Sequence, residues 1–509
     1  MCGSLRIPAV VCAVMLAIPA AGEEGVLDKV QEYRRAHESE ILSEFRAMLS
    51  IPNYYRDAAN IRRNADFIAA AFRKRGVATR LLEIPDAPPV VYGELLRKGA
   101  QLTIGVYAHY DGQAVAQPDW RTSPFEPKLL DALGQEISID ATRQFPSEAR
   151  LYARSAGDDK APIQAVLAAL DALKAAGIKP VANLKFLFEG EEEPDSPHLQ
   201  QILGAHPEVL RADIWLLSDG PIHPSRQMQV YFGARGERVL DITAYGPAHP
   251  IHSGHYGNWA PNPIVLLTRL LASMRDEDGR ILIKGLSDGV RSLTAAEEAV
   301  LERAPSPDDA LRAELQLAQT EGDGAPLARR ILLPAVNLIG IRGGHVGADA
   351  TNIISTEAVA AIDFRFVPDQ TLDSVEKAVE RHVRDQGFFI VRETPDAETR
   401  RRHARIVKLS WRPGYAGFRT SPDLPQVHAV VRAVALATGR EPIEIVGVGA
   451  TVPMFHLSSD GRVPVIGLPI ANHDNNQHAA NENVRLQNLW DGIAIFAAIF
   501  TSMDAGEAH

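Results

Sequence analysis

Side chains that could bind metal ions follow apolar, strand-like runs at several places in the sequence. His109 and Asp111 stand directly after IGVYA, and Asp219 stands near the end of IWLLSDGP. The stretch LFEGEEEPDS adds a dense group of carboxylates, at residues 189–193, to the end of another apolar run. In an α/β sheet, strand ends that are far apart in the sequence converge at one edge, so we expect these side chains to meet.

Two further motifs add residues of the same kind. LYARSAGDDKAP contributes Asp158 and Asp159, and NHDNNQHAANENVR contributes His478 near the C-terminus. Oxygen and nitrogen ligands without sulfur suit zinc, manganese or cobalt. Converging carboxylates and histidines are also what a two-metal hydrolytic site needs, with ions about 3.5–4 Å apart.

Each motif taken alone has a simpler explanation. A His-x-Asp at a strand end is commonly a satisfied surface pair, and Ser-Asp-Gly is commonly a turn. The Asp pair at 158–159 could complement the dipole of a following helix, and a glutamate run is usually a solvated surface. It is the combination of the five motifs that favours a metal site.

The N-terminal segment has the pattern of a secretory signal. One cation, Arg6, precedes an apolar run over residues 7–18, and small residues occupy positions 20–22. The pattern predicts cleavage after Gly22 and a secreted or periplasmic protein. An uncleaved anchor is the alternative, but the apolar run is short for a membrane span. We therefore expect no stable membrane anchor after cleavage.

The cysteines and the net charge exclude several kinds of site. Cys2 and Cys12 both lie in the predicted signal, so the mature chain should hold no disulfide, cysteine nucleophile or cysteine metal ligand. The formal net charge of -11 argues against nucleic acid as a partner, because phosphate binding needs clustered Lys and Arg.

The elements that must position these motifs alternate between helix and strand. This alternation predicts an α/β catalytic domain, with a mixed sheet and helices on both faces. A chain of this length is expected to form two domains. Apolar periodicity predicts helices at 26–49, 59–75 and 162–176, and strands at 79–84, 90–95, 102–108, 214–217 and immediately before the acidic turn.

The pattern changes between residues 233 and 418, which predict a compact α+β insertion decorated by the charged stretch 276–328. After residue 418 a helix and apolar strands resume the first domain. The predicted organisation is a signal peptide (1–22), a first catalytic part (23–232), the insertion (233–418) and a second catalytic part (419–509). The later elements are predicted as strands at 238–245, 336–341 and 358–366 and helices at 262–275, 371–386 and 427–438.

In order and spacing, the five motifs resemble those of the M20-type dinuclear zinc metallopeptidases. This family includes carnosinase-like dipeptidases, succinyl-diaminopimelate desuccinylase, acetylornithine deacetylase, aminoacylase and glutamate carboxypeptidases. The resemblance extends from about residue 41 to 500. It implies a ferredoxin-like lid and dimerisation domain in the insertion, a homodimer, and two divalent ions, zinc or else manganese or cobalt.

The resemblance also assigns the metal ligands. His109 and Asp219 would hold one ion, Glu193 and His478 the other, and Asp158 would bridge both. The family has a cis peptide bond directly after this bridging aspartate. Three carboxylates and one bridging hydroxide would balance two divalent ions, and the ions would lower the pKa of the water that supplies this hydroxide.

The resemblance gives two further carboxylates catalytic roles. Asp111 would accept a hydrogen bond from His109 and so fix the tautomer of the imidazole. Glu192 would be the general base, taking a proton as hydroxide attacks and returning it to the leaving nitrogen. Glu189 and Glu191 would be supporting or solvated.

The insertion supplies candidate substrate contacts. His252, in PIHSGHYGNW, matches the family's His-Ser-Gly and would reach across a dimer to the partner's site, although by composition alone this is an ordinary polar loop. Asn352 and Arg365 resemble the family's contacts to the substrate. They could equally be a turn residue and a paired strand residue.

One departure from the family concerns the substrate. IVGVGATVPMF, residues 445–455, stands where dipeptidases carry an Arg ahead of Gly-Gly-Ser, and no Arg lies between Arg440 and Arg462. Arginine is the usual bidentate partner of a carboxylate. Arg365 is therefore the remaining candidate for recognising a free substrate C-terminus.

The predicted function is a dinuclear-metal-dependent hydrolase that cleaves the peptide bonds of dipeptides or short peptides. An N-acyl-amino-acid amidohydrolase is the alternative within the same chemistry, because the sequence does not display the substrate pocket. The alternative from another class is a catalytically silent binding protein of the same fold. Glu192 argues against it, since a silent protein has no need of a charged base beside buried metals.

Overall fold

The computed structural model describes residues 21–503 of the 509-residue chain. The predicted signal segment lies outside the described residues except for its last two positions, so its export and cleavage stay predictions. Within the described part, no helix is both long enough and apolar enough to cross a membrane.

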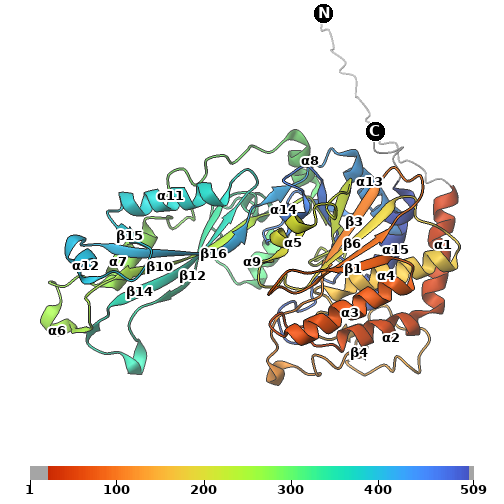
Figure 1. The fold of residues 1–509 in the computed structure, drawn as a ribbon, viewed down its shortest axis with the longest axis horizontal. Helices are drawn as coiled ribbons and strands as arrows, with labels where there is room; N and C mark the ends of the chain where they lie inside the picture. Colours follow the sequence, from red (N-terminus) through yellow and green to blue (C-terminus); the bar gives the residue numbers. More distant parts are fainter. Residues whose placement is uncertain (1–20, 504–509) are drawn as a thin grey trace, which may run out of the picture.

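Two lobes, each built on its own sheet, lie side by side along the long axis of the molecule (Figure 1). The larger lobe holds an eight-stranded sheet. In spatial order its strands are β1 (Ala78–Leu82), β2 (Val90–Leu95), β6 (Asn183–Glu189), β3 (Thr103–His109), β7 (Ile214–Leu217), β19 (Val465–Gly467), β8 (Gln229–Tyr231) and β18 (Ile443–Ile445). Strands β6, β3, β7 and β19 are parallel neighbours, whereas β1, β2 and β8 introduce antiparallel pairs. The sheet is therefore mixed.

Side chains of the central strands alternate between two hydrophobic cores, one on each face. Val106 and Ala108 of β3 enter the first core, whereas Tyr107 enters the second. Helices cover both faces, and the mixed α/β class is confirmed. The helices that contribute to the first core are α1 (Ala21–Ala36), α2 (Glu38–Leu49), α3 (Ala58–Lys74), α4 (Lys160–Ala175), α8 (Ala295–Arg303), α13 (Pro425–Thr438) and α15 (Leu486–Ser502). Those that contribute to the second are α5 (Leu199–Ala205) and α14 (Met454–Leu457).

The smaller lobe holds a five-stranded sheet with helices packed on one face. In spatial order its strands are β12 (Ala335–Arg342), β14 (Glu357–Phe366), β10 (Gly236–Tyr245), β16 (Ile406–Tyr415) and β15 (Phe389–Val391). All neighbours are antiparallel except β15 and β16. Helices α7 (Pro263–Ala272) and α11 (Leu372–Asp385) share a core with this sheet. Its opposite face is not part of that core.

Three small sheets join segments that are distant in the sequence. The pair β9 (Gly233–Ala234) and β17 (Phe418–Arg419) forms where the chain enters and leaves the smaller lobe. The boundaries predicted at 232/233 and 418/419 themselves stay predictions. The other two small sheets are β4 (Lys128–Leu130) with β5 (Arg150–Tyr152) and β20 (Asn483–Arg485), and β11 (Ile251–His252) with β13 (Ile353–Ile354).

The charged stretch 276–328 does not simply decorate the smaller lobe, contrary to the sequence prediction. Its helix α8 (Ala295–Arg303) packs against β18 of the large sheet, and Val300 enters the first core of the larger lobe. Arg303 Nη2 lies 3.1 Å from Glu444 Oε1 of β18. The high charge of the stretch indicated exposure to solvent, but it carried no information about which lobe the stretch would contact.

Most of the predicted elements are present, with ends shifted by one to three residues. The bounds of β2 and β7 are those that the apolar runs predicted. The single helix predicted at 26–49 is wrong, because His37 leaves helical geometry and separates α1 from α2. The apolar periodicity on either side of this residue is continuous enough to hide the break.

Gly105 of β3 packs against Trp215 of β7 with no room for a side chain. A Cβ added at Gly105 would lie 2.3 Å from the Trp215 ring, and Trp215 is fully buried. We expect Gly105→Ala to lower the free energy of unfolding by about 1–3 kcal/mol, measured by urea denaturation. Gly204→Ala, in α5, is the matched control, because nothing lies within 4 Å of the added Cβ. Equal stability of the two variants would contradict this packing.

Candidate metal centre

The predicted metal ligands stand at the carboxyl ends of neighbouring strands. His109 ends β3, Asp219 follows the end of β7, and Glu193 follows the end of β6. Because β6, β3 and β7 are parallel neighbours, these ends reach the same edge of the sheet. Asp158 enters from the loop before α4, and His478 from the loop between β19 and β20. The peptide bond after Asp158 is cis, as the resemblance implied.

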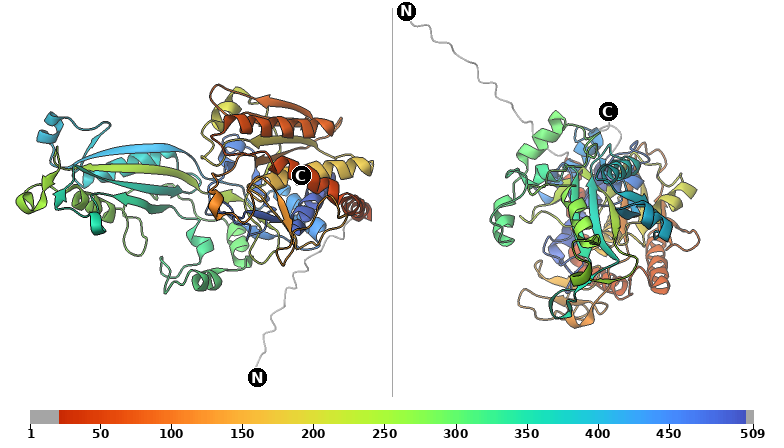
Figure 2. Two further views of the ribbon diagram at one scale, coloured as in Figure 1. Left: turned by 90° about the horizontal axis from the view of Figure 1, so that it is seen from below. Right: turned by 90° about the vertical axis from the view of Figure 1, so that its left-hand side faces the viewer.

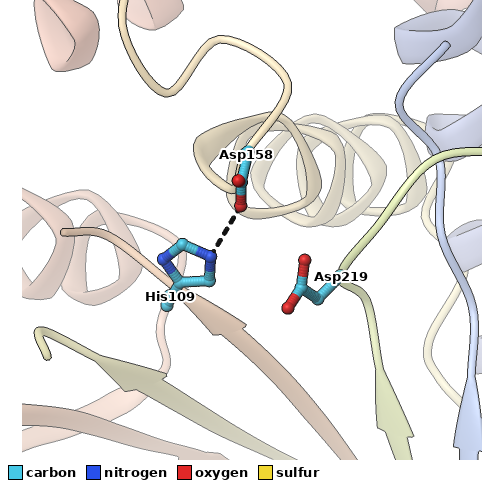
Figure 3. Close-up of side chains that lie close together, drawn as sticks. All are labelled: His109, Asp158 and Asp219. Atoms are coloured by element: carbon cyan, nitrogen blue, oxygen red, sulfur yellow. Dashed lines mark hydrogen bonds and ion pairs between the residues drawn. The ribbon is translucent and has the colours of Figure 1, made fainter. Parts of the chain in front are cut away.

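Two groups of ligand atoms share Asp158. His109, Asp158 and Asp219 form one group, and Asp158, Glu193 and His478 form the other, with the atoms of each group within 4.8 Å of one another. His109 Nε2 lies 2.8 Å from Asp158 Oδ1. His478 Nε2 lies 3.0 Å from both Asp158 Oδ2 and Glu193 Oε2. Figure 3 shows the His109 ring and the Asp158 and Asp219 carboxylates gathered around one space.

The charges at this centre favour cations. Burial, together with the neighbouring Asp158, raises the pKa of Asp219 to about 7. Burial also raises the pKa of Glu192 well above its usual value. Hydrogen bonds to Asp158 and Glu193 raise the pKa of His478 to about 10. Protons are thus drawn to the positions that divalent ions would take, and the oxygen and nitrogen donors fit two such ions.

Asp111 connects His109 to the acidic turn. Its Oδ1 lies 3.3 Å from His109 Nδ1, and both side chains are fully buried. The backbone N–H groups of Glu192 and Glu193 donate to the two carboxylate oxygens of Asp111, each at 3.1 Å. One carboxylate therefore lies against the imidazole and also holds the turn that presents the two glutamates.

The other glutamates of the acidic turn are buried and hydrogen-bonded, so of the two sequence interpretations, supporting or solvated, the structure agrees with the first. The Tyr107 hydroxyl donates to Glu189 Oε2 at 2.6 Å, and burial raises the pKa of Glu189 to about 8. Glu191 accepts the backbone N–H of His198 at 3.0 Å and is also buried. Both side chains support the turn from within.

Glu482, which the sequence analysis did not single out, fixes the loop that presents Asp158. Its carboxylate accepts the backbone N–H groups of Ser155, Gly157 and Asp158 at 2.9–3.0 Å, and Arg154 Nη1 donates to it at 2.7 Å. Pairing of β20 with β5 brings this residue to the loop. The only signal in the sequence was its place in NHDNNQHAANENVR, shortly after the predicted histidine ligand.

His252 and Asn352 lie together at the far end of the smaller lobe. The backbone N–H of Ser253 donates to the carbonyl of Asn352 at 2.8 Å, and β11 pairs with β13. Both side chains are exposed. Figures 1 and 2 show α6 (Ser253–Tyr256) at the end of the lobe remote from the large sheet. Within the described chain, the structure does not bring these two residues to the metal ligands.

Arg365, the third predicted substrate contact, lies on β14 and reaches the larger lobe. Its Nη1 donates to the Thr451 hydroxyl at 2.6 Å. It also forms ion pairs with Glu237 and Asp363. The structure therefore shows a paired strand residue, as one of the two sequence interpretations stated.

Comparisons with known proteins identify relatives of the whole chain. The model of "Peptidase family M20/M25/M40" matches residues 105–502. The Cys-Gly metallodipeptidase of Schizosaccharomyces pombe is 25% identical over 488 residues, which cover 92% of this chain and 97% of the relative. The Beta-Ala-His dipeptidase of Homo sapiens is 24% identical over 506 residues, covering 94% and 93%.

Solved structures have the same fold. An M20 family metallo-carboxypeptidase from Sulfolobus solfataricus superposes with a TM-score of 0.76 at 24% identity, covering 91% of this chain and 99% of its own. Human carnosine dipeptidase 1 superposes with a TM-score of 0.71 at 23% identity, covering 94% and 99%. Both lobes of the chain therefore lie within the region of shared fold.

Replacing Glu482 by Gln should weaken metal binding while keeping the side-chain volume. Glutamine turns one acceptor oxygen into an NH₂ group, which cannot accept the backbone N–H groups of the Asp158 loop. We expect the zinc affinity to fall by about 10- to 100-fold, measured by competition with a chelator of known affinity. Glu136→Gln changes an exposed carboxylate and should bind like the wild type. Undiminished affinity in Glu482→Gln would show that this carboxylate does not position the ligand.

Proposed function

The chain belongs to peptidase family M20/M25/M40 and is a metallopeptidase, and from this premise we propose that it cleaves dipeptides or short peptides at a dinuclear metal centre. The observation that carries the proposal is the pair of ligand groups that share Asp158. The relatives from S. pombe and human are named for the dipeptides Cys-Gly and Beta-Ala-His, which supports a dipeptide substrate.

Two divalent ions, zinc by the donor set or else manganese or cobalt, are proposed for this centre. His109 and Asp219 would hold one, Glu193 and His478 the other, and Asp158 both. When bound, such ions polarise the scissile carbonyl and lower the pKa of a water molecule at the centre.

Glu192 is proposed as the general base. Its Oε2 lies 3.9 Å from His109 Nε2, beside the two ligand groups but a member of neither. This carboxylate would take the proton of the attacking water and deliver it to the leaving nitrogen. The carboxylate of Asp111 accepts the backbone N–H of Glu192 and so restrains the turn. This contact would keep the Glu192 carboxylate close to the attacking water and to the leaving nitrogen.

Two alternatives remain to be tested against this function. An N-acyl-amino-acid amidohydrolase would use the same centre on a different acyl group, and only a substrate comparison separates it from a dipeptidase. A catalytically silent binding protein of the same fold would have no use for a base beside the ligand groups. The named dipeptidases among the relatives favour peptide hydrolysis over both.

A homodimer formed through the smaller lobe is also proposed. The smaller lobe has a ferredoxin-like arrangement of its main elements, which supports a lid and dimerisation role. These elements follow one another along the chain as β10-α7-β12-β14-α11-β16, and the four strands lie in the sheet in the order β12-β14-β10-β16. Strand β12 is an edge of this sheet, and its Leu338, Ile339 and Ile341 side chains are 52%, 56% and 59% exposed. An apolar edge strand of this kind favours pairing with a second copy. In such a dimer, His252 would act in the partner's site.

Glu192→Gln should abolish turnover and keep the metals. The amide preserves size but cannot accept a proton, so we expect hydrolysis to fall by at least about 100-fold. The measurement compares the wild type, Glu192→Gln and the exposed control Glu83→Gln on dipeptides, longer peptides and N-acyl amino acids, with metal content by elemental analysis. Hydrolysis by Glu192→Gln at the wild-type rate would contradict the role of Glu192 as the general base. Cleavage of N-acyl amino acids alone would favour the amidohydrolase.

His252→Ala should lower turnover by about 100-fold without loss of metal, because a donor to the developing oxyanion is missing. Mixing this variant with Glu192→Gln should restore about a quarter of wild-type activity, since half of the dimers are mixed and each holds one complete site. Subunit exchange is confirmed by differently tagged chains. If exchange is complete and activity does not return, His252 does not act across the dimer.

A further inference from the structure

A cavity opens at the edge of the large sheet where the parallel strands β3 and β6 begin, opposite the metal centre. Its volume is about 460 Å³, which is within the range of about 300–1,000 Å³ that is typical of small-molecule sites. Strand β6 begins at this edge with Asn183 and ends with Glu189 beside His109. Its seven residues, at about 3.3 Å each, place the two edges about 20 Å apart. The cavity is therefore separate from the proposed active site.

The floor of the cavity is apolar and belongs to the margin of the first core. Leu170 and Leu173, on the last two turns of α4, are 7% and 2% exposed. Leu95, at the end of β2, and Ile178, just after α4, are partly buried against the same core. An alkyl chain lying on these side chains would remove apolar surface from water.

The rim of the cavity is positively charged. Its described lining includes five cations and no carboxylate: Arg75, Arg97, Lys98, Lys174 and Lys179. The last four are exposed, and within residues 21–503 none of these four forms an ion pair with an acidic side chain. The chain as a whole has a formal net charge of -11, so this group of cations is the reverse of its average surface. Several positive charges around one opening attract an anion.

Arg75, the fifth cation, is not available to a ligand. Its side chain is 7% exposed, and its guanidinium lies 2.7 Å from Glu44 Oε2 and 2.5 Å from Asp171 Oδ2. Its Nη1 also donates to the carbonyl oxygen of Ala71, and its Nε to that of Leu167. These contacts tie α2 and α3 to α4 at the cavity wall and leave one net negative charge there. The four exposed cations outweigh this charge.

Hydrogen bonds hold the walls of the cavity in place. The backbone N–H of Arg97 donates to Asn183 Oδ1 at 2.8 Å, and the Arg97 guanidinium donates to the carbonyl oxygen of Pro180. The backbone N–H of Val181 donates to the Phe500 carbonyl of α15 at 2.9 Å. The segment after α4 is thus fixed both to the end of β2 and to α15, so the cavity is formed before any ligand arrives.

We propose that this cavity binds a single-chain amphiphile with an anionic head group, either a carboxylate or a phosphate. The alkyl chain would lie on the floor formed by Leu170 and Leu173, and the head group would face Lys98, Lys174 and Lys179 at the rim. A purely apolar ligand would gain nothing from the cations, and a small anion would gain nothing from the floor. The proposal is independent of the peptidase function.

The test measures the binding of sodium decanoate and of decyl phosphate, each below its micelle concentration, to the metal-loaded full chain by calorimetry. The two probes distinguish the carboxylate from the phosphate source of the head group. The triple variant Lys98→Ala, Lys174→Ala, Lys179→Ala should bind both probes at least about 10-fold more weakly, because three charges beside the head group are missing. Decan-1-ol, which has no charge, should bind the wild type and this variant equally.

A matched triple variant controls for the change in net charge. Lys29→Ala, Lys284→Ala, Lys377→Ala removes three exposed lysines that do not line the cavity and should keep the wild-type affinity. Peptide hydrolysis at the wild-type rate by both triple variants would show that the fold and the metal centre are intact.

A substitution at the rim tests the same site with the opposite charge. Leu96 lines the cavity and is 66% exposed, so Leu96→Asp should leave the fold intact. The new carboxylate should repel the head group and weaken decanoate binding by about 10-fold. Leu133→Asp places the same charge at another exposed leucine, outside the cavity, and should bind decanoate like the wild type.

Three results would overturn the proposal. The first is the absence of decanoate and decyl phosphate binding to the wild type. The second is binding that persists unchanged in the Lys98, Lys174 and Lys179 variant, which would place the probes elsewhere, such as at the metal centre. The third is equal affinity for decanoate and acetate, because the apolar floor would then contribute nothing.

Discussion

Mutual repulsion among buried carboxylates is the constraint that organises this molecule. Four carboxylates approach one another at a single edge of the large sheet, and the imidazoles of His109 and His478 lie beside them: Asp158, Asp219, Glu192 and Glu193. One buried carboxylate without a partner costs several kcal/mol. Such an arrangement persists only if cations balance it, so folding of the strand ends and metal binding are linked.

The scaffold around the centre supplies fixed donors rather than flexible ones. Backbone N–H groups bind Asp111 and Glu482, and each of these carboxylates restrains a different loop of the site. Lys160, at the start of α4, donates to the Met48 carbonyl and to Asn64 Oδ1, and burial lowers its pKa to about 7. Helices α2 and α3 are thereby tied to the helix that follows Asp158. Rigid contacts of this kind set the spacing of the ligand groups.

The sequence could predict the strands and the groups at their ends, because both leave a local signal. An apolar run that stops at His109 or Asp219 identifies a strand and its carboxyl end together. The position of α8 could not be predicted in this way, because one buried valine in a charged helix does not identify its partner. Glu482 was missed for a related reason: its role depends on the pairing of β20 with β5, which lie more than 300 residues apart.

The two ligand groups differ in their access to solvent. His109, Asp158 and Asp219 are all buried, whereas the side chain of His478 is 53% exposed. An ion held by His109, Asp158 and Asp219 would therefore be shielded from water, whereas an ion held beside His478 would stay open to solvent. If two ions occupy the proposed centre, the one beside His478 would exchange with solvent more readily than the one beside His109.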